Sequence, residues 1–376
     1  MALSITLHIM KQKERIHAFV EAIWHWYGQH KRSLPWRDLA INDDTERAYR
    51  ILVSEVMLQQ TQVERVIVIY ERFLKRFPRL RDLATASNRD VILAWRGMGY
   101  NSRALRLRDA ARAVLQQHHG IFPCEMNALL AMDGLGFYTA AAIRNFAFNL
   151  PTPCIDTNIR RILHRTFVGP EREDGTWEKN DHYLLGIAEE VLDEAIRQYD
   201  EFFNNVAAKR GSCGPRGCPP ERTVRYGRGA APLREKRDRE RKTVGLSLAP
   251  SNWHAALMDF GSLVQTKRSP KWSQCPLTDQ NLMKASARNF PQFKSRIPKS
   301  EPGRTIAGRF VPNRITRGRI IESLRDATEG LLVASIGRKV CTDWSVTQRR
   351  WLMKLLKKLE QEKLVARKGA IYVLHK

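Results

Sequence analysis

The feature that most constrains the fold is the period of the apolar residues between positions 12 and 200. They recur every three or four residues, as in "ILVSEVMLQQTQVERVIVIYERFLKRF" and "YLLGIAEEVLDEAIRQY", which is the spacing of one face of an α-helix. No alternation of apolar and polar residues competes with this period in that stretch. Short Gly- and Pro-bearing segments at 97–100 and 120–123 separate the helical patterns. The sequence therefore predicts one large all-α module over residues 1–200.

The rest of the chain divides by composition into four segments. Residues 201–250 are predicted to be a basic insertion, because they are rich in Gly, Pro and Arg and contain few large aliphatic side chains. A last core helix is expected within 251–285, followed by a Lys- and Pro-bearing linker at 286–312. Residues 313–376 hold two helical patterns and then two short strand patterns around a Lys-Gly turn. This order predicts a small winged-helix-like α+β domain, although a small helical cap would give much of the same pattern.

The charge balance favours a polyanionic partner. Lys and Arg total 64 against 39 Asp and Glu, which gives a formal net charge of +25, and nucleic acid is the leading candidate. A merely basic surface is the alternative. No apolar run approaches the ~20 residues of a membrane span, and the N-terminus lacks the features of a signal peptide. We therefore expect no membrane partner and a protein that stays where it is made. The six cysteines form no framework, which is typical of a reducing compartment.

Three short segments contain residues with notable chemistry. Glu55 stands in "VSEVMLQQT", an otherwise apolar helical segment, where burial would raise its pKa as a general acid requires. An acid on the exposed stripe of that helix is the alternative. Gly134 and Gly136 make a tight turn before a helix, which would expose backbone N–H groups to a phosphate, although such turns also simply join helices. Asp156 precedes a basic amphipathic helix, where capping is the usual role of an aspartate.

The order of these segments resembles that of the helix-hairpin-helix DNA glycosylase superfamily, and in particular the adenine DNA glycosylases of the MutY type. The motifs that carry the resemblance are "SLPWRD" at 33–38, "VSEVMLQQTQVERV" at 53–66, "LAWRGMGYNSRALRLRDAA" at 93–111, "GLGFYTAAAI" at 134–143 and "IDTNIRRILHR" at 155–165. The segment "EVMLQQTQV" is the most specific, because related thymine glycosylases and endonuclease III carry other residues after the shared acid. The resemblance implies a two-lobed helix-hairpin-helix glycosylase fold and an enzyme of base excision repair.

The resemblance also implies roles for individual residues. Glu55 matches the general acid that protonates the leaving base, and Asp156 the carboxylate that stabilises the oxocarbenium-like transition state, with Asn158 close to it. Tyr138 stands where relatives with lyase activity place an attacking lysine, which implies a monofunctional enzyme that uses water as nucleophile. The other matched positions are Trp36 and Arg37 in the base pocket, Gln60 as a wedge in the base stack, Tyr100 opposite the flipped-out base, and Gly134, Gly136, Lys267 and Arg268 on the DNA backbone.

Family members usually carry an iron–sulfur loop spaced Cys-x6-Cys-x2-Cys-x5-Cys. With Cys275 in third place, that spacing selects Gln265, Trp272, Cys275 and Asn281. One thiolate cannot hold a [4Fe–4S] cluster, so we expect no cluster and no other cofactor, and Cys275 is interpreted as the remnant of a cluster site. A metal site made of Cys213, Cys218 and Cys275 is conceivable, but the first two lie in the Gly- and Pro-rich insertion and no fourth ligand is evident.

The leading hypothesis is a cluster-free, monofunctional DNA glycosylase that hydrolyses the N-glycosidic bond of a flipped-out adenine opposite 8-oxoguanine or guanine. Its expected partner is double-stranded DNA, and its expected state is a monomer that is cytoplasmic and nucleoid-associated if the source is prokaryotic. Residues 304–376 look too short and too helical for the Nudix-like domain with which MutY proteins sense 8-oxoguanine. The alternatives are a thymine or uracil glycosylase acting opposite guanine, and a catalytically silent DNA-binding module on a glycosylase scaffold.

Overall fold

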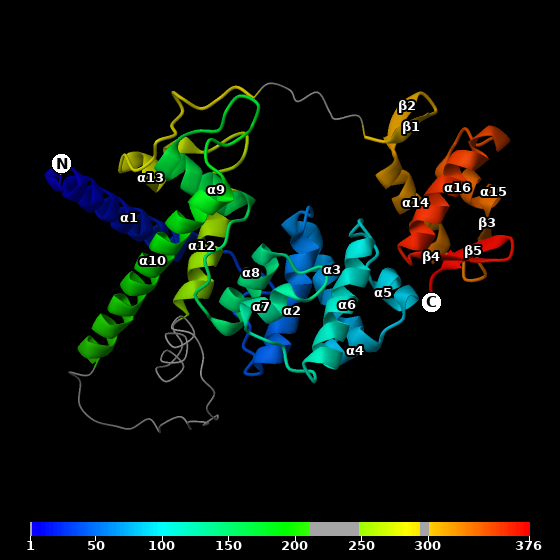
Figure 1. Ribbon diagram of the computed structural model, residues 1–376, viewed down its shortest axis with the longest axis horizontal. Helices are drawn as coiled ribbons and strands as arrows, with labels where there is room; N and C mark the ends of the chain where they lie inside the picture. Colours follow the sequence, from blue (N-terminus) through cyan, green and yellow to red (C-terminus); the bar gives the residue numbers. More distant parts are fainter. Residues whose placement is uncertain (1, 211–247, 294–300) are drawn as a thin grey trace. The chain divides into compact units, whose positions relative to one another are not determined.

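The computed structural model describes the backbone of residues 2–210, 248–293 and 301–376 (Figure 1). The chain forms two compact units, and each unit is assembled from two separate stretches of sequence. Unit 1 takes Met1–Arg32 and Arg144–Lys294, and unit 2 takes Ser33–Ile143 and Ser295–Lys376. The described residues of the first 200 form helices, turns and loops without a strand, so the prediction of an all-α module is confirmed.

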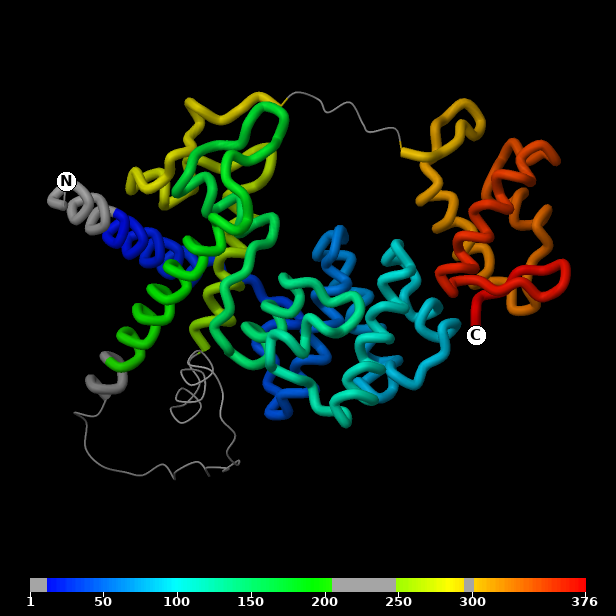
Figure 2. The backbone as a smooth tube through the Cα atoms, viewed as in Figure 1, coloured from blue at the N-terminus to red at the C-terminus, as the bar shows by residue number. Residues whose placement is uncertain are grey.

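Unit 1 is built around the N-terminal helix. Its helical elements are α1 (Ala2–His30), α9 (Thr157–Leu163), the π-helical turn η1 (His164–Val168), α10 (Asp181–Arg210), α12 (Ala249–Leu263), the 3-10 turn η3 (Trp272–Gln274) and α13 (Pro276–Asp279). Figure 2 shows α1, in blue, reaching the green α10, and the two helices are in contact. The ring of Trp253 on α12 lies 5.3 Å from that of Trp24 and 6.1 Å from that of Phe19, centroid to centroid. Aromatic burial therefore joins the beginning of the chain to its middle.

Unit 2 opens with a compact group of helices. They are α2 (Asp44–Leu58), α3 (Val63–Arg76), α4 (Leu80–Thr85), α5 (Asn88–Ala94), α6 (Ser102–Gln117) and α7 (Met126–Leu130), and α8 (Phe137–Phe148) begins in unit 2 and ends in unit 1. The Asp43 side chain caps α2 by accepting a hydrogen bond of 2.9 Å from the Glu46 N–H. The buried Tyr49 hydroxyl donates a hydrogen bond of 2.7 Å to the Phe77 carbonyl, which ties α2 to the end of α3.

Residues 301–376 form a C-terminal module within unit 2. Its elements are β1 (Gly303–Ile306), β2 (Arg309–Pro312), α14 (Asn313–Arg325), β3 (Leu331–Leu332), α15 (Val333–Val340), the 3-10 turn η4 (Val346–Gln348), α16 (Arg349–Gln361), β4 (Val365–Lys368) and β5 (Ile371–Leu374). Strands β1 and β2 form an antiparallel hairpin, and β3, β5 and β4 form an antiparallel sheet in that order. Three helices followed by a β4–β5 hairpin have the order of a winged helix, and the prediction of a small α+β domain is confirmed.

Several elements of this module were not predicted from the sequence. The hairpin β1–β2 lies inside the segment 286–312 that was interpreted as a linker, and both the short strand β3 and helix α15 were missed. The hairpin strands are only four residues long, and the turn between them requires positive φ at Ala307 as well as at Gly308, so no strong turn signal marks them. Helix α10 also continues to Arg210, into the segment interpreted as the basic insertion, and residues 211–247 of that insertion lie outside the described residues.

The C-terminal module packs onto α5 and α6. A buried apolar cluster joins Ile92 of α5 and Leu105 of α6 to residues of α14, α15, α16, β4 and β5. The buried guanidinium of Arg325, on α14, donates hydrogen bonds of 2.9 Å to the Ile92 carbonyl and to the Asn101 side-chain oxygen. The Asn88 side chain donates one of 2.9 Å to the Lys363 carbonyl. The module is therefore fixed to the helices of unit 2 by both apolar burial and directed hydrogen bonds. None of the described helices is long and apolar enough to cross a bilayer.

Candidate active site and DNA-contact residues

Asp156 is held at the start of α9 in unit 1. Its backbone is extended, and one carboxylate oxygen accepts a hydrogen bond of 2.6 Å from the Ile159 N–H, which makes Asp156 the N-cap of the helix. The other oxygen accepts a hydrogen bond of 3.1 Å from the Asn158 side-chain amide. Desolvation raises the pKa of Asp156, and this outweighs the hydrogen bonds and the nearby Arg161 charge, which lower it. The carboxylate therefore caps the helix and is also held with little access to bulk water.

The orientation of Asn158 is fixed by neighbours behind Asp156. The Arg161 guanidinium donates a hydrogen bond of 2.6 Å to the Asn158 side-chain oxygen and one of 2.7 Å to the Gly261 carbonyl of α12. A Cβ at Gly261 would lie 2.6 Å from the Asn158 Cβ, so only glycine permits this approach of the two helices. Because Arg161 occupies the amide oxygen, the amide nitrogen of Asn158 faces Asp156. Arg161 and Gly261 were not predicted as part of the site.

Glu55 lies near the end of α2 in unit 2. It is only 6% exposed, and its neighbours along the helix, Val53, Val56 and Met57, are also buried. The alternative of an acid on the exposed stripe of α2 is therefore wrong. A carboxyl group in such surroundings is uncommon and is typical of a functional position. Glu55 and Asp156 thus belong to different units, and each is buried or desolvated within its own surroundings.

Gln60 and Tyr100 are both exposed and both have a strained backbone. Gln60 has φ of 56° and Tyr100 has φ of 44°, which are left-handed values that side chains other than glycine rarely adopt. Tyr100 is among the exposed large hydrophobic residues. An aromatic ring and an amide presented by two adjacent loops suit contact with an opened base stack.

The buried Arg103 holds these two loops together. Its guanidinium donates hydrogen bonds to the carbonyls of Val56 at 2.9 Å and Met98 at 3.3 Å, to the Gln59 carbonyl, and to the Thr61 hydroxyl at 3.2 Å. It also lies 5.5 Å from the centroid of the Tyr100 ring. Burial lowers the pKa of Arg103 to about 10, which still leaves it charged at neutral pH. Arg103 was not predicted from the sequence as part of the site.

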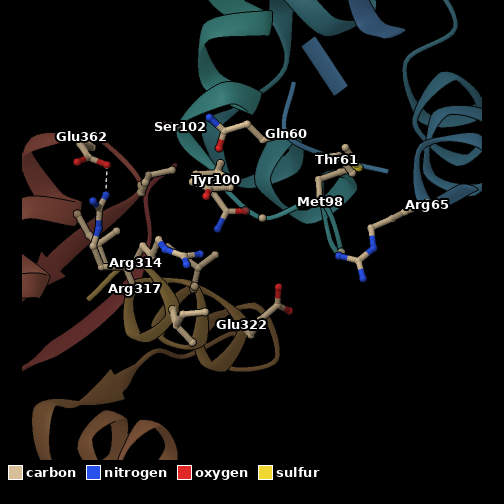
Figure 3. A pocket seen from close by; sticks show the side chains of 18 of the residues that line it. Gln60, Thr61, Arg65, Met98, Tyr100, Ser102, Arg314, Arg317, Glu322 and Glu362 are labelled. Atoms are coloured by element: carbon tan, nitrogen blue, oxygen red, sulfur yellow. Dashed lines mark hydrogen bonds and ion pairs between the residues drawn. The ribbon is translucent and has the colours of Figure 1, made fainter. Parts of the chain in front are cut away.

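A cavity of about 690 Å³ lies beside the Gln60 and Tyr100 loops within unit 2 (Figure 3). Its opposite wall is formed by α14 of the C-terminal module, which contributes Arg314 and Arg317. Arg314 forms an ion pair with Glu301 at 3.0 Å, and Arg317 forms an ion pair with Glu362. This volume falls in the range of about 300–1,000 Å³ typical of small-ligand pockets. The contribution of α14 was not predicted from the sequence.

Trp36 and Arg37, predicted for the base pocket, lie elsewhere in unit 2. Trp36 is buried, and its ring meets that of Tyr70 edge to face at 5.4 Å between centroids. The Arg37 N–H donates to the Leu34 carbonyl at 2.9 Å in a tight turn. Neither residue lines the cavity beside Gln60 and Tyr100. Their role in a base pocket stays a prediction.

The predicted hairpin is exposed between α7 and α8. Gly134 has φ of +88°, and a Cβ there would lie 3.3 Å from the Arg106 side chain, so the glycine is required by both conformation and space. Gly136 is exposed directly before α8, where free backbone N–H groups of the helix begin. Tyr138, in the first turn of α8, is partly buried. This geometry suits a backbone phosphate, as the sequence predicts.

Lys267 and Arg268 are exposed on the loop after α12, and a buried arginine holds that loop in place. Arg165 donates hydrogen bonds of 3.0 Å to the Thr266 carbonyl and 3.2 Å to the Lys267 carbonyl. It also forms an ion pair with Glu171 at 2.6 Å. The hydrogen bonds from Arg165 therefore hold the backbone of the loop, while the side chains of Lys267 and Arg268 face solvent.

The side chains at the four positions selected by the iron–sulfur spacing make protein contacts or face solvent. The buried Gln265 donates to the Cys275 sulfur at 3.3 Å and the Met283 sulfur at 3.5 Å, and accepts a hydrogen bond of 3.0 Å from Arg165. Trp272 packs at 5.5 Å from the Phe290 ring, and Asn281 is exposed. No three His, Cys, Asp or Glu side chains gather into a metal-binding group within the described parts of the chain. One thiolate among an amide, an indole and an exposed asparagine does not fit a cluster. Cys213 and Cys218 lie outside the described residues.

Comparison with known proteins shows that parts of this chain are similar to DNA repair proteins. Residues 53–181 match the HhH-GPD superfamily base excision DNA repair protein. The adenine DNA glycosylase of Mus musculus is 40% identical over 221 residues, covering 58% of this chain and 41% of that protein. That of Mycolicibacterium smegmatis is 29% identical over 303 residues, covering 81% of this chain and 79% of that protein. The chain therefore spans less than half the length of the mouse relative.

The fold comparison agrees with the sequence comparison. The structure of a thermostable thymine-DNA glycosylase is similar with a TM-score of 0.50 and 22% identity, covering 72% of this chain and 96% of that chain. A likeness at this identity shows the fold alone, and the predicted helix-hairpin-helix glycosylase fold is confirmed.

Proposed function

We infer, since this chain belongs to the HhH-GPD superfamily of base excision DNA repair proteins, that it removes mispaired adenine from duplex DNA. The observation that carries the proposal is the presence of two carboxyl groups, the buried Glu55 and the partly buried Asp156, whose pKa desolvation raises, at the motif positions of the adenine glycosylases. Hydrolysis of a glycosidic bond requires two such groups, one acid and one ionised.

The two carboxyl groups divide the chemistry between them. Glu55 delivers a proton to the adenine ring as the bond between the base and the sugar carbon breaks, so that the base leaves uncharged. Asp156, ionised, faces the positive charge that develops on the sugar, and Asn158 and Arg161 hold it in that orientation. Water then adds its hydroxyl to the sugar carbon and releases a proton. The products are free adenine and an abasic site.

We propose that the enzyme has no lyase activity. A lyase of this kind needs an amine that attacks the sugar carbon, and the position of that lysine in bifunctional relatives is occupied here by Tyr138. A phenol cannot form a Schiff base. The DNA strand is therefore expected to stay intact after excision until alkali or another enzyme cleaves the abasic site.

We also propose that the enzyme works without an iron–sulfur cluster. The proposal is supported by the donor set around Cys275, in which Gln265 and Met283 fill the space at hydrogen-bond distance from the thiol. The prediction is a colourless protein, purified without oxygen, that contains no stoichiometric iron or acid-labile sulfide. Absorption bands of thiolate-bound iron, or stoichiometric iron in fully active protein, would contradict it.

The cavity beside Gln60 and Tyr100 is proposed to take the nucleotide opposite the excised adenine. Tyr100 offers a face for stacking, and Gln60 and Arg314 offer hydrogen-bond donors to a purine edge. In this proposal α14 supplies contacts to 8-oxoguanine or guanine that a Nudix-like domain supplies in relatives. We also propose that the enzyme acts on double-stranded DNA inside the cell, as a monomer.

The proposal is tested with end-labelled duplexes under single-turnover conditions. Each duplex carries adenine opposite 8-oxoguanine, guanine, cytosine or thymine, or carries thymine or uracil opposite guanine. Breaks that require alkali and occur only at mispaired adenine support a monofunctional adenine glycosylase. Breaks confined to thymine or uracil would overturn the assignment of adenine, and borohydride trapping of a protein–DNA adduct would overturn the absence of lyase activity.

A further inference from the structure

Helix α16 of the C-terminal module carries a strongly basic exposed face. Its exposed cations are Arg349, Arg350, Lys354, Lys357 and Lys358, which we call the basic face. The opposite side of the helix is buried through four leucines at positions 352, 355, 356 and 359. None of the five cations forms an ion pair with the described part of the chain, although most arginines of the neighbouring α14 do. The structure of the module therefore leaves these charges without an internal partner.

The spacing of the basic face makes it unfavourable in isolation. Arg350, Lys354 and Lys358 follow one another at intervals of four residues, which places like charges side by side along the helix. Acidic residues on this helix are confined to Glu360, whose carboxylate accepts a hydrogen bond of 3.3 Å from the Arg367 N–H. An ordinary solvated helix face would mix charges of both signs. A row of cations without acids is instead typical of a surface that binds a polyanion.

The hairpin β4–β5 adds cations at a second position of the module. Arg367 and Lys368 precede its turn and are exposed. The Arg367 guanidinium donates a hydrogen bond of 2.9 Å to the Gly369 carbonyl, and Gly369 has φ of +59°, which together fix the shape of the turn. In helix-turn-helix proteins the second helix of the motif contacts DNA, and α16 follows α15 in that position.

We propose that the basic face of α16, with Arg367 and Lys368, binds backbone phosphates of the duplex outside the site of base excision. The inference rests on the proposed function for its ligand, because duplex DNA is the polyanion on which such an enzyme works. The surface contacts phosphates and does not select a sequence, since contacts to the DNA backbone carry no direct sequence information.

The position of α16 connects this surface to the cavity beside Tyr100. Leu359 at the end of α16, and Glu362 after it, line that cavity. The helix has 13 residues, so Arg349 lies about 18 Å along its axis from Gln361. That length corresponds to about five base pairs of duplex. Because Arg325 and Asn88 fix the module to α5 and α6, the duplex would be held at a set distance from the Gln60 and Tyr100 loops.

The test measures binding to an undamaged duplex, so it is independent of excision. The variant Lys354→Gln/Lys357→Gln/Lys358→Gln is compared with the control Lys13→Gln/Lys75→Gln/Arg81→Gln, which removes three exposed cations that lie outside the module. The dissociation constant of a 30-base-pair duplex is measured by fluorescence anisotropy across a series of salt concentrations. Melting temperatures of both variants and of the parent check that the fold is retained.

The proposal predicts that the affinity of the α16 variant for the duplex depends less steeply on salt concentration than that of the parent. Each lost phosphate contact lowers the slope of log affinity against log salt by about 0.9, so the slope should fall by about 2 to 3. The control should keep the slope of the parent. An unchanged slope in the α16 variant, or an equal fall in the control, would overturn the proposal. If the parent excises no adenine but the slope still falls in the α16 variant, the proposed function is overturned and the proposal for α16 stands.

Discussion

Arg165 and Glu171 form an ion pair that solvent does not reach. The guanidinium and carboxylate lie 2.6 Å apart, and the side chains are 0% and 3% exposed. Arg165 also donates to Gln265, Thr266 and Lys267, so the pair stands beneath the loop that carries the predicted DNA-contact residues. In this chain a buried ion pair and a hydrogen-bonded glutamine lie where the resemblance places the iron–sulfur loop of other family members.

Breaking this pair from one side should destabilise the protein strongly. Arg165→Met leaves the Glu171 carboxylate buried without a partner, which costs about 3–5 kcal/mol of unfolding free energy. Replacing both residues, as Arg165→Met/Glu171→Leu, should recover much of that loss. Urea unfolding measures both effects, with the exposed Arg268→Met as the matched control. Equal losses in the single and double variants would show that the ion pair itself is unimportant.

The fall of the excision rate at low pH should follow the protonation of the Asp156 carboxyl group. Desolvation raises its pKa, and only the ionised form stabilises the sugar cation, so the rate falls as pH drops through this raised value. Asn158→Ala removes a hydrogen bond that lowers this pKa, and the fall in rate should shift to higher pH. The control Thr157→Ala should leave it unchanged. Single-turnover rates from pH 4 to 8 test this, and a fall in rate at the same pH in Asn158→Ala would contradict it.

The same shift has a defined sign for stability. Because the folded-state pKa of Asp156 is raised, the folded protein binds this proton more tightly than the unfolded chain does. The contribution of the group to stability is therefore lost as pH rises from the ordinary value through the raised one. Ionisation of the desolvated Asp156 carboxyl group thus costs the fold some stability.

His254 should make the protein sensitive to mild acid. It is buried in α12, its Nδ1–H donates to the Pro250 carbonyl at 2.8 Å, and desolvation lowers its pKa to about 4. Between pH 6.5 and 4 the unfolded chain gains a proton that the folded chain does not, so unfolding free energy falls by up to about 1.4 kcal/mol per pH unit.

In the variant His254→Gln the side chain at position 254 no longer binds a proton in the unfolded chain. The unfolding free energy of this variant, measured in urea at pH 7 and at pH 5, should fall less between the two values than that of the parent. The exposed His182→Gln should behave like the parent. A parent and a His254→Gln variant with the same pH dependence would contradict the assignment.

The sequence pointed to residues with notable chemistry more readily than to the residues that hold them. The catalytic roles of Glu55 and Asp156 come from the family resemblance and stay predictions, whereas the capping role of Asp156 follows from its place before a helix. The supporting residues Arg103, Arg165 and Arg325 bind backbone carbonyls of distant segments. Every residue has a carbonyl, so no sequence pattern marks such partners.

The C-terminal module shows the same limit at the level of the fold. The β4–β5 hairpin was predicted because a Lys-Gly turn separates two apolar patterns. The β1–β2 hairpin was missed because each strand has only four residues and most of them are partly buried, so the strands lack the alternation of apolar and polar residues that one buried face imposes. The packing of Arg325 against Ile92 and Asn101 depends on contacts more than 200 positions apart, which only the folded chain brings together.

Arg314 should influence discrimination between opposite bases. It lines the cavity beside Tyr100, and its loss removes a charged donor from the proposed site of the opposite nucleotide. Arg314→Ala should lower the preference for adenine opposite 8-oxoguanine over adenine opposite cytosine by about 10-fold, the effect of roughly one hydrogen bond to a charged group. The exposed Arg309→Ala is the matched control. Retained preference in Arg314→Ala, with the control also unchanged, would exclude α14 from the site.

The most direct test of the central claim is the single-turnover rate of adenine excision by the parent and by Glu55→Gln on the same mispaired duplex. Glutamine keeps the size of the side chain but cannot deliver a proton. We expect the parent to excise adenine and the variant to be slower by about 10²- to 10⁴-fold, while its affinity for the duplex and its melting temperature change little. Equal rates in parent and variant, or no excision by the parent on any adenine mispair, would contradict the account.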